Sequence, residues 1–195
     1  MNILKLLPLN KGSLDVLFEI YAEGEDYLRS ISKKLKMNPS LVFNVLNKLY
    51  NSKIVIKRNK GKEVQYSLEK NRDYELLIRL LEEYHLEKII NQTNILKTMI
   101  NLLINNAELM NSAYKIYLFG SYVSGHPTEK SDIDILFIGE NRKLISKECR
   151  EISMIVGVDI NPLIYPKKKF KSDLSKKEAL LSSIVNNIKN RAIIK

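Results

Sequence analysis

Residues 115–139 read Lys-Ile-Tyr-Leu-Phe-Gly-Ser-Tyr-Val-Ser-Gly-His-Pro-Thr-Glu-Lys-Ser-Asp-Ile-Asp-Ile-Leu-Phe-Ile-Gly. Two apolar runs, 115–119 and 133–138, enclose a Gly-Ser turn and a polar loop. Short apolar runs bounded by turn residues are typical of buried strands. We therefore expect two strands here, with the polar groups gathered at their connection.

Two carboxylates open the second of these runs. Asp132 and Asp134 are two residues apart, and side chains in a strand alternate between its two faces, so both point to one face while Ile133 points to the other. Neighbouring carboxylates repel each other unless a cation lies between them. Mg²⁺ is the natural candidate, because it prefers carboxylate oxygens together with water and phosphate.

The Gly-Ser turn precedes this pair. Gly120 lets the backbone approach a ligand closely, and Ser121 offers a hydroxyl and an N–H group. A short helix starting here would turn its free N–H groups toward a phosphate. A phosphate cradle beside a metal-binding pair indicates metal-assisted phosphoryl chemistry on a nucleotide.

At these residues the chain resembles the nucleotidyltransferase superfamily of the DNA polymerase β type, in its minimal prokaryotic form. The family pattern is Gly-Ser, three residues, Gly, five residues, then Ser-Asp-x-Asp. The positions that match it are Gly120, Ser121, Gly125, Ser131, Asp132 and Asp134. The resemblance covers about residues 96–165 and implies a small mixed sheet with flanking helices.

The resemblance also implies roles. Gly120 and Ser121 would hold the triphosphate of a nucleoside triphosphate, with ATP favoured, and Ser131 would support the turn that aims Asp132. Asp132 and Asp134 would hold two Mg²⁺ ions, and a third carboxylate on a later strand would complete the site or act as base. Asp159 is the matching candidate. The implied reaction moves a nucleoside monophosphate to an unknown acceptor and releases pyrophosphate.

Two further points follow from the resemblance. Minimal members are often paired with a small helical partner protein as toxin and antitoxin. Many also carry an arginine in the loop that reads Tyr122-Val123-Ser124 here, and Lys130 or Lys115 are the substitutes that this chain offers. The alternative reading is therefore a transcriptional regulator whose nucleotidyltransferase domain senses nucleotide without turnover.

The N-terminal part predicts three helices and a hairpin. Ser13–Tyr21 has helical spacing, with Ser13 as N-cap and Gly24 as the end. Leu28, Ile31 and Leu35 mark a short second helix. A third helix, 39–52, has Pro39 in its first turn, and its apolar stripe is Leu41, Val42, Val45, Leu46 and Leu49.

Two β-rich runs, 54–59 and 63–68, follow around Gly61 and predict a basic hairpin. Three helices and a basic hairpin resemble the winged helix-turn-helix domain of small prokaryotic repressors, over residues 13–69. A helix of this kind fits the major groove and a basic wing can follow the backbone. The candidate DNA-binding residues are Asn44, Asn47, Lys48, Lys57, Arg58, Lys60 and Lys62.

The charge supports this interpretation. The chain of 195 residues has a formal net charge of +10, and residues 27–70 contain 11 Lys or Arg against the two acids Glu63 and Glu69. Such an imbalance in a compact segment attracts a polyanion, either DNA or RNA. There are two alternatives. The lysines could serve only to keep the surface solvated, or the winged helix could be used for protein contacts.

The remaining stretches complete the predicted organisation. Residues 72–110 lack Gly and Pro and predict one long helix, which 91–94 could divide into two. Residues 174–193 predict a final amphipathic helix. We expect an α+β protein with a winged helix-turn-helix domain at 1–70, a linking helix and dimer seam at 71–95, and a nucleotidyltransferase domain at 96–195.

Composition excludes several classes. A single cysteine, Cys149, rules out a disulfide framework, and no apolar run is long enough for a transmembrane helix. The apolar N-terminus, 1–8, lacks the long core and cleavage site of a secretory signal. We therefore expect a cytoplasmic protein. A homodimer is one candidate assembly, because winged-helix repressors usually read two half-sites, but the apolar stripes of 71–110 equally suit packing within one chain.

Overall fold

The computed structural model describes residues 10–195, so the apolar N-terminus considered above lies outside the described residues. The chain divides into two compact units, Met1–Tyr84 and His85–Lys195, and the boundary falls inside helix α4. Over the part of the chain that the structure describes, no helix is long and apolar enough to cross a membrane.

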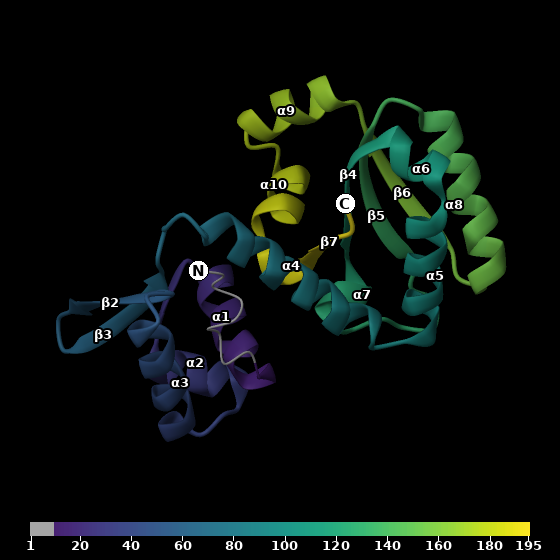
Figure 1. The fold of residues 1–195 in the computed structure, drawn as a ribbon. Helices are drawn as coiled ribbons and strands as arrows, with labels where there is room; N and C mark the ends of the chain where they lie inside the picture. Colours follow the sequence, from purple (N-terminus) through teal and green to yellow (C-terminus); the bar gives the residue numbers. More distant parts are fainter. Residues whose placement is uncertain (1–9) are drawn as a thin grey trace. The chain divides into compact units, whose positions relative to one another are not determined.

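The N-terminal unit is a winged helix, as the sequence predicts (Figure 1). Its elements are α1 (Lys11–Glu23), β1 (Glu25–Tyr27), α2 (Leu28–Leu35), α3 (Pro39–Asn51), β2 (Val55–Lys60), β3 (Glu63–Leu68) and the first part of α4 (Tyr74–Ile90). Strands β2 and β3 form the expected hairpin, and β1 adds an antiparallel third strand on the other side of β3. The sequence analysis missed β1 because three residues are too few for a periodic signal.

Two details of this unit differ from expectation. The N-cap of α1 is Asn10, whose side chain accepts a hydrogen bond from the Ser13 N–H, so the prediction of Ser13 as cap is wrong. Leu41 was placed in the apolar stripe of α3, but its side chain is 51% exposed. The helix buries only Val42, Val45, Leu46 and Leu49.

The long helix predicted over 72–110 is divided into three. Helix α4 ends at Ile90, and α5 (Asn94–Asn105) begins after Thr93, whose side chain caps it. The division at 91–94 was foreseen. A second division at Asn106 was not: its side chain caps α6 (Ala107–Ser112) by accepting a hydrogen bond from the Leu109 N–H. Asparagine competes with the helical backbone in this way, which is why it favours helix ends.

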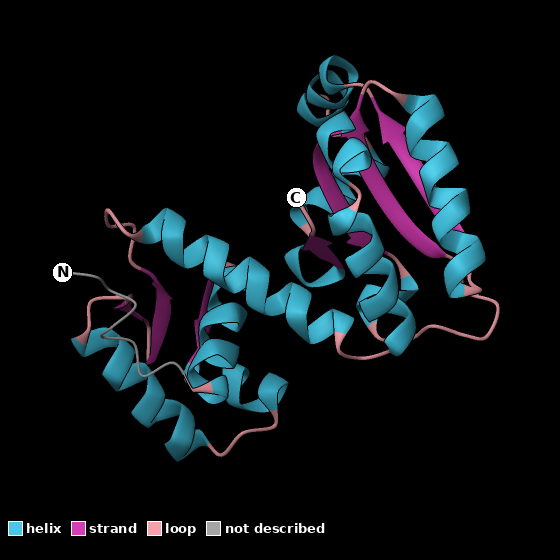
Figure 2. Ribbon diagram, turned by 45° about the vertical axis from the view of Figure 1, so that its right-hand side comes forward, coloured by secondary structure: helices cyan, strands magenta, loops and turns pink. Residues whose placement is uncertain are grey.

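The C-terminal unit is built on a mixed four-stranded sheet in the order β6-β5-β4-β7 (Figures 1 and 2). Its further elements are β4 (Ala113–Phe119), α7 (Ser121–Ser124), β5 (Ile133–Gly139), α8 (Arg142–Val156), β6 (Ile160–Tyr165), α9 (Lys167–Ser175), α10 (Ala179–Asn186), the 3₁₀ helix η2 (Ile188–Asn190) and β7 (Arg191–Ile193). Strands β5 and β6 are parallel, while β4 runs antiparallel to both of its neighbours. The α+β class with a mixed C-terminal sheet is therefore confirmed.

Strand β5 separates two apolar layers. Ile133, Ile135 and Phe137 point into the larger core, which residues of α5 and α8 complete. Leu136 and Ile138 point to the other face, where residues of α9 and α10 cover them. Asp134 shares this second face because it lies two residues before Leu136. The far end of that face is thus covered by helices, and the two aspartates stand at its near end.

The last predicted helix is wrong. Residues 174–193 form the end of α9, then α10, η2 and the edge strand β7, which pairs with β4. The apolar residues of this segment fitted a helical stripe, and sequence alone did not show that Ala192 is fully buried in the core on the α5 and α8 side of the sheet.

Candidate functional site

The paired aspartates sit where β5 begins. Ile133 is fully buried, so the alternation of β5 places Asp134 on the opposite face. Asp132 lies one residue before the strand, close enough for its charge to act on Asp134. Asp132 is exposed and Asp134 is half-buried. Burial raises the pKa of the Asp134 carboxyl, a hydrogen bond from Asn161 lowers it in part, and the charge of Asp132 raises it further. Together these effects leave the pKa of the Asp134 carboxyl above its usual value, with burial as the largest cause.

The Gly-Ser turn lies directly against Asp134. Gly120 has a φ of +81°, and a Cβ built on it would contact the Asp134 carboxylate and lie 3.2 Å from its carboxyl carbon. Only glycine therefore allows the turn and the carboxylate to approach this closely. The Gly120 carbonyl accepts hydrogen bonds from the N–H groups of Val123 and Ser124 and starts the single turn of α7. The structure thus brings together the glycine and the carboxylate that the sequence pattern associates.

The loop between the two motif halves is closed by local hydrogen bonds. The Thr128 N–H donates to Ser131 Oγ over 2.8 Å, and the Ser131 N–H donates to the Thr128 carbonyl over 3.0 Å. Ser131 therefore holds the turn that leads into Asp132. Its predicted role was to support this turn. Gly125 ends α7 with a φ of +80°, a conformation that favours glycine.

Asp159 lies at the same end of the sheet but one residue before β6. Its carbonyl accepts a hydrogen bond from the Ile133 N–H over 2.8 Å, and its side chain is exposed. Asp159 was expected on a later strand, but it lies in the connection between α8 and β6. No group of three Asp, Glu, His or Cys side chains disposed to hold a metal is found within residues 10–195. A role for Asp159 as third ligand therefore stays a prediction.

Asn161 is a site residue that the sequence analysis missed. It is paired with Asp134 across β5 and β6, and its side-chain amide donates to Asp134 Oδ1 over 3.0 Å. The amide oxygen of the same side chain is a further oxygen donor beside the two carboxylates. A polar residue just after the expected Asp159 was the only sequence signal for it.

The cation expected beside the phosphate cradle has a new candidate. Lys115 pairs with Ile138 at the far end of β4, whereas Phe119 pairs with Asp134. Arg191 of β7 also pairs with Phe119 and so lies in the same row of the sheet as Asp134. Its Nε donates to the Val185 carbonyl over 2.9 Å. The sequence analysis missed Arg191 because this segment was expected to be helical.

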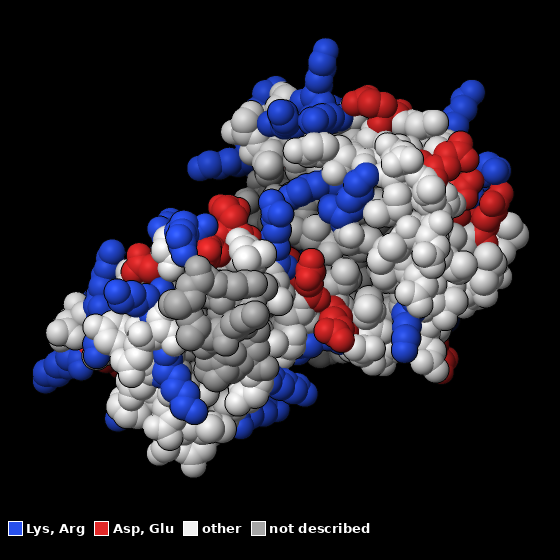
Figure 3. Space-filling model, viewed as in Figure 1, with Lys and Arg blue, Asp and Glu red and all other residues white. Residues whose placement is uncertain are grey.

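The second candidate surface lies on α3 and the hairpin of the N-terminal unit. Of the predicted DNA-binding residues, Asn44, Lys48, Lys57, Arg58, Lys60 and Lys62 are exposed and Asn47 is partly exposed. Figure 3 shows Lys and Arg side chains projecting from the hairpin end of this unit. Lys57 Nζ lies 4.3 Å from the centre of the Tyr50 ring, so this cation joins the hairpin to α3.

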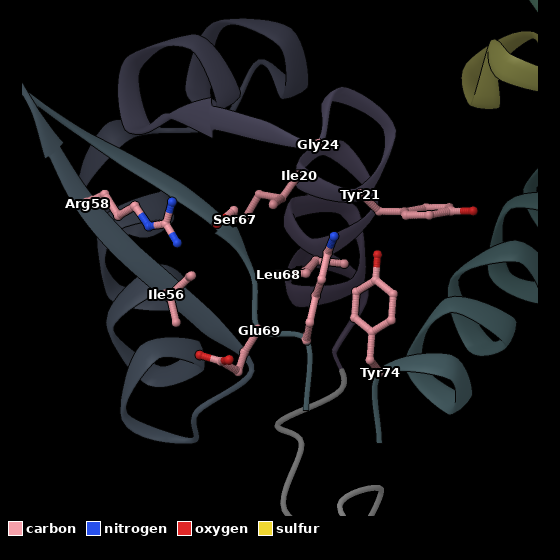
Figure 4. Close-up of a pocket in the computed structure, with 10 residues that line it drawn as sticks. Ile20, Tyr21, Gly24, Ile56, Arg58, Ser67, Leu68, Glu69 and Tyr74 are labelled. Carbon is pink, nitrogen blue, oxygen red and sulfur yellow. The ribbon is translucent and has the colours of Figure 1, made fainter. Parts of the chain in front are cut away.

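Not all of these cations face α3. Ile56, Arg58 and Lys60 alternate with Lys57 along β2, so they point to the opposite side of the hairpin. Lys60 pairs with Glu25 at 3.7 Å. Arg58 instead lines a pocket of about 380 Å³ at the base of the hairpin, together with Tyr21, Ser67 and Tyr74 (Figure 4). The structure therefore splits the predicted basic surface between two faces.

Lys34 belongs to the basic segment but is neutralised. It forms ion pairs with Asp26 at 2.8 Å, Glu23 at 3.0 Å and Glu19 at 3.5 Å. Burial alone would lower its pKa, but the hydrogen bonds and charges of Asp26 and Glu23 outweigh burial and raise it. Lys34 therefore ties α2 to α1 and β1 rather than adding to a nucleic-acid surface.

Fold and site together define a protein with a winged-helix unit and a unit of the nucleotide-transferring type. The sequence profile of the nucleotidyltransferase domain matches residues 100–194. A Methanocaldococcus jannaschii protein is 31% identical over 87 residues, which are 44% of this chain and 85% of the relative. Its name is that of a protein adenylyltransferase, an activity that the name itself marks as unproven. The chain belongs to the nucleotidyltransferase-domain family.

Solved structures resemble parts of the chain more distantly. A homodimeric winged helix-turn-helix DNA-binding domain from Mycobacterium bovis is 23% identical with a TM-score of 0.35, covering 45% of this chain and 76% of that one. A toxin-antitoxin structure with AMP-PNP is 20% identical with a TM-score of 0.36, covering 53% of this chain and 73% of that one. TM-scores this low carry no functional conclusion.

The closeness of Gly120 to Asp134 yields a first prediction. Gly120→Ala should destabilise the protein by about 1–3 kcal/mol more than Gly157→Ala, measured by denaturant unfolding followed by circular dichroism. Both glycines have positive φ, at +81° and +71°, but nothing lies within 4 Å of a Cβ on Gly157. The two backbones also differ: Gly120 has a ψ of −156°, a region essentially restricted to glycine, whereas Gly157 is left-handed helical with a ψ of 20°. Backbone strain and the steric clash therefore both predict the larger loss at Gly120. Equal losses for the two variants would contradict the described contact.

The raised pKa of Asp134 yields a second prediction. A carboxyl whose pKa is raised on folding adds stability that is fully present below its unfolded pKa and is lost as pH rises through its folded pKa. Asp134→Asn keeps an acceptor for Asn161 and removes the charge, so without added metal the variant should melt at a higher temperature than the wild type at pH 7. The difference should shrink as pH falls toward 4.

Thermal denaturation followed by circular dichroism across this pH range measures the difference. Asp173→Asn in α9 is the matched control, because it removes a carboxylate of the same unit away from the pair. An Asp134→Asn variant that melts below the wild type at pH 7 would count against electrostatic strain at the site.

Proposed function

We propose that the C-terminal unit transfers a nucleoside monophosphate from a nucleoside triphosphate to an acceptor hydroxyl and releases pyrophosphate. The observation that carries this proposal is the Asp134 carboxylate of β5 against Gly120 of the Gly-Ser turn, with the charge of Asp132 acting on it from the residue before the strand. Membership of the nucleotidyltransferase-domain family supports the same reaction class.

The donor groups fit Mg²⁺. Two carboxylates that repel each other and a nearby amide oxygen of Asn161 form an oxygen-rich site, which a hard divalent cation prefers. Asp132 and Asp134 would hold the ions, two in number by resemblance, with Asp159 completing the set. When bound, Mg²⁺ neutralises charge on the triphosphate.

The chain's own residues would then position the reactants. Gly120 and Ser121 receive the β- and γ-phosphates through backbone N–H groups and the serine hydroxyl, while Gly125 and Ser131 shape the loop. The acceptor oxygen forms a bond to the α-phosphorus as the bond from that phosphorus to the bridging oxygen breaks. Pyrophosphate leaves with the bonding electrons, and a carboxylate, for which Asp159 is the candidate, takes the hydroxyl proton.

The name of the archaeal relative supports a choice of nucleotide and acceptor. It describes adenylyl transfer to protein, so ATP is the favoured donor and a protein hydroxyl the favoured acceptor. A small helical partner protein, as in the paired systems of the family, is one such acceptor.

For the N-terminal unit we propose binding to double-stranded DNA through α3 and the hairpin. The exposed cations and amides on α3 and β2 support it, because phosphate contacts position a protein on DNA and amide side chains read base edges. A homodimer reading two half-sites fits this use of the fold.

One observation favours a second candidate function for the whole chain. Among the described residues no third acidic side chain joins the aspartate pair, and the neutral Asn161 bonds Asp134 instead. A site with fewer negative charges would bind nucleotide and turn it over slowly or not at all. In this candidate, nucleotide binding regulates DNA binding, and the chain is a transcriptional regulator.

Transfer can be tested with labelled ATP. The protein incubated with Mg²⁺, extract of the source cells and α-labelled ATP should label a protein, whereas γ-labelled ATP should not. Asp132→Asn should reduce labelling at least a hundredfold, and the control Asp173→Asn should leave it unchanged. Label transfer that survives Asp132→Asn would exclude these aspartates. Nucleotide binding without any labelling would favour the sensor.

DNA binding can be tested by its salt dependence. The logarithm of the affinity for a duplex should fall linearly with the logarithm of salt concentration, with a slope of about −0.9 for each phosphate neutralised. Lys57→Ala or Lys48→Ala should each flatten the slope by about one, and Lys97→Ala in α5, outside this unit, should not. A duplex affinity that does not change with salt would indicate a winged helix used for protein contacts.

A further inference from the structure

The outward side of α3 carries two large apolar side chains that the fold leaves exposed. Leu41 is 51% exposed and Phe43 is 48% exposed. Both lie in the N-terminal half of the helix, on either side of the exposed Asn44 around its axis. Neither contributes to the core, which α3 reaches through Val42, Val45, Leu46 and Leu49. Over the described residues, about half of each of these two apolar side chains is therefore left exposed to solvent.

Two cations and one acidic residue surround Phe43. It lines a groove of about 500 Å³ together with Val64 of β3, the cations Arg29 and Lys62, and Glu63. Lys48 lies exposed one turn beyond Asn44 on the same helix. An apolar surface bordered by cations fits a polyanion that also offers apolar groups. Duplex DNA does so in its major groove, where each thymine carries a methyl group.

We propose that Leu41 and Phe43 contact thymine 5-methyl groups while Asn44 bonds adenine, so that the N-terminal unit prefers A·T-rich DNA. This inference rests on the DNA binding proposed above and adds the base preference. In helix-turn-helix proteins the N-terminal residues of the recognition helix contact base edges. Asparagine pairs with the N6 and N7 positions of adenine, and apolar side chains contact the thymine methyl.

Replacement of thymine by uracil tests the proposal directly, because it removes the methyl group and keeps every hydrogen-bonding group. Three duplexes of 30 base pairs serve as probes: alternating A·T, the same duplex with uracil for thymine, and alternating G·C. Binding is measured by fluorescence anisotropy with the full chain at several salt concentrations. A buried methyl group is worth about a fourfold change in affinity, so the wild type should bind the A·T duplex about fourfold to tenfold more tightly than its uracil form.

Three variants show whether contact with the thymine methyl group causes the difference in affinity between the thymine and uracil duplexes. Leu41→Ala with Phe43→Ala should bind the thymine and uracil duplexes equally, because an effect of DNA shape would survive this change. Asn44→Ala should weaken the preference for A·T over G·C, because the bond to adenine is lost, and should keep the thymine effect. Leu76→Ala, which truncates an exposed leucine of α4 that is 43% exposed, is the matched control and should change neither.

Equal affinity of the wild type for thymine and uracil duplexes, with the expected salt slope, would overturn this inference and leave DNA binding intact. Salt-independent or absent duplex binding would overturn both. Loss of a dimer in the Leu41→Ala, Phe43→Ala variant, with thymine discrimination unchanged, would also overturn it and assign this face to a second copy of the chain.

Discussion

The contact between the Asp134 carboxylate and the backbone of Gly120 is the constraint on which the nucleotide site depends. It exists because Ile133, Ile135 and Phe137 are buried on one face of β5, which turns Asp134 to the other face. Because glycine has no side chain, the turn can close onto the carboxylate. Asp134 is half-buried beside the like charge of Asp132, and both effects raise the pKa of its carboxyl, so a bound cation would relieve the repulsion.

The two units present charges of opposite sign to a phosphate group. The winged-helix unit presents exposed cations on α3 and the hairpin and can meet a polyanion directly. The nucleotidyltransferase unit presents carboxylates, which repel a triphosphate unless a divalent cation lies between them. Binding by the first unit should therefore depend on ionic strength, and binding by the second on the metal. This difference lets the two functions be measured separately in the intact chain.

Much of the fold and of the candidate site could be predicted from the sequence, because the motifs and hydrophobic patterns that indicate them lie within short segments. The Gly-Ser and Ser-Asp-x-Asp elements have fixed spacing, and α3 and the hairpin have clear periodicity and turn residues. The parts that failed depend on tertiary contacts. The spacing of Leu41 fits the apolar stripe of α3, yet its side chain is exposed because the core lies against other residues of the helix. Strand β7 was taken for helix because its pairing partner β4 lies far away in sequence. That Asn161 belongs to the site could be seen only from the register of β5 against β6, which pairs it with Asp134.

Asp132, Asp134 and the Gly-Ser turn are proposed to form a metal-dependent nucleotide site. Calorimetric titration of the protein with each of the four nucleoside triphosphates, with and without Mg²⁺, tests it most directly. The double variant Asp132→Asn, Asp134→Asn is titrated alongside. We expect saturable binding that requires Mg²⁺, favours ATP and is lost in the double variant. Binding of equal strength without Mg²⁺, or in the double variant, would contradict it.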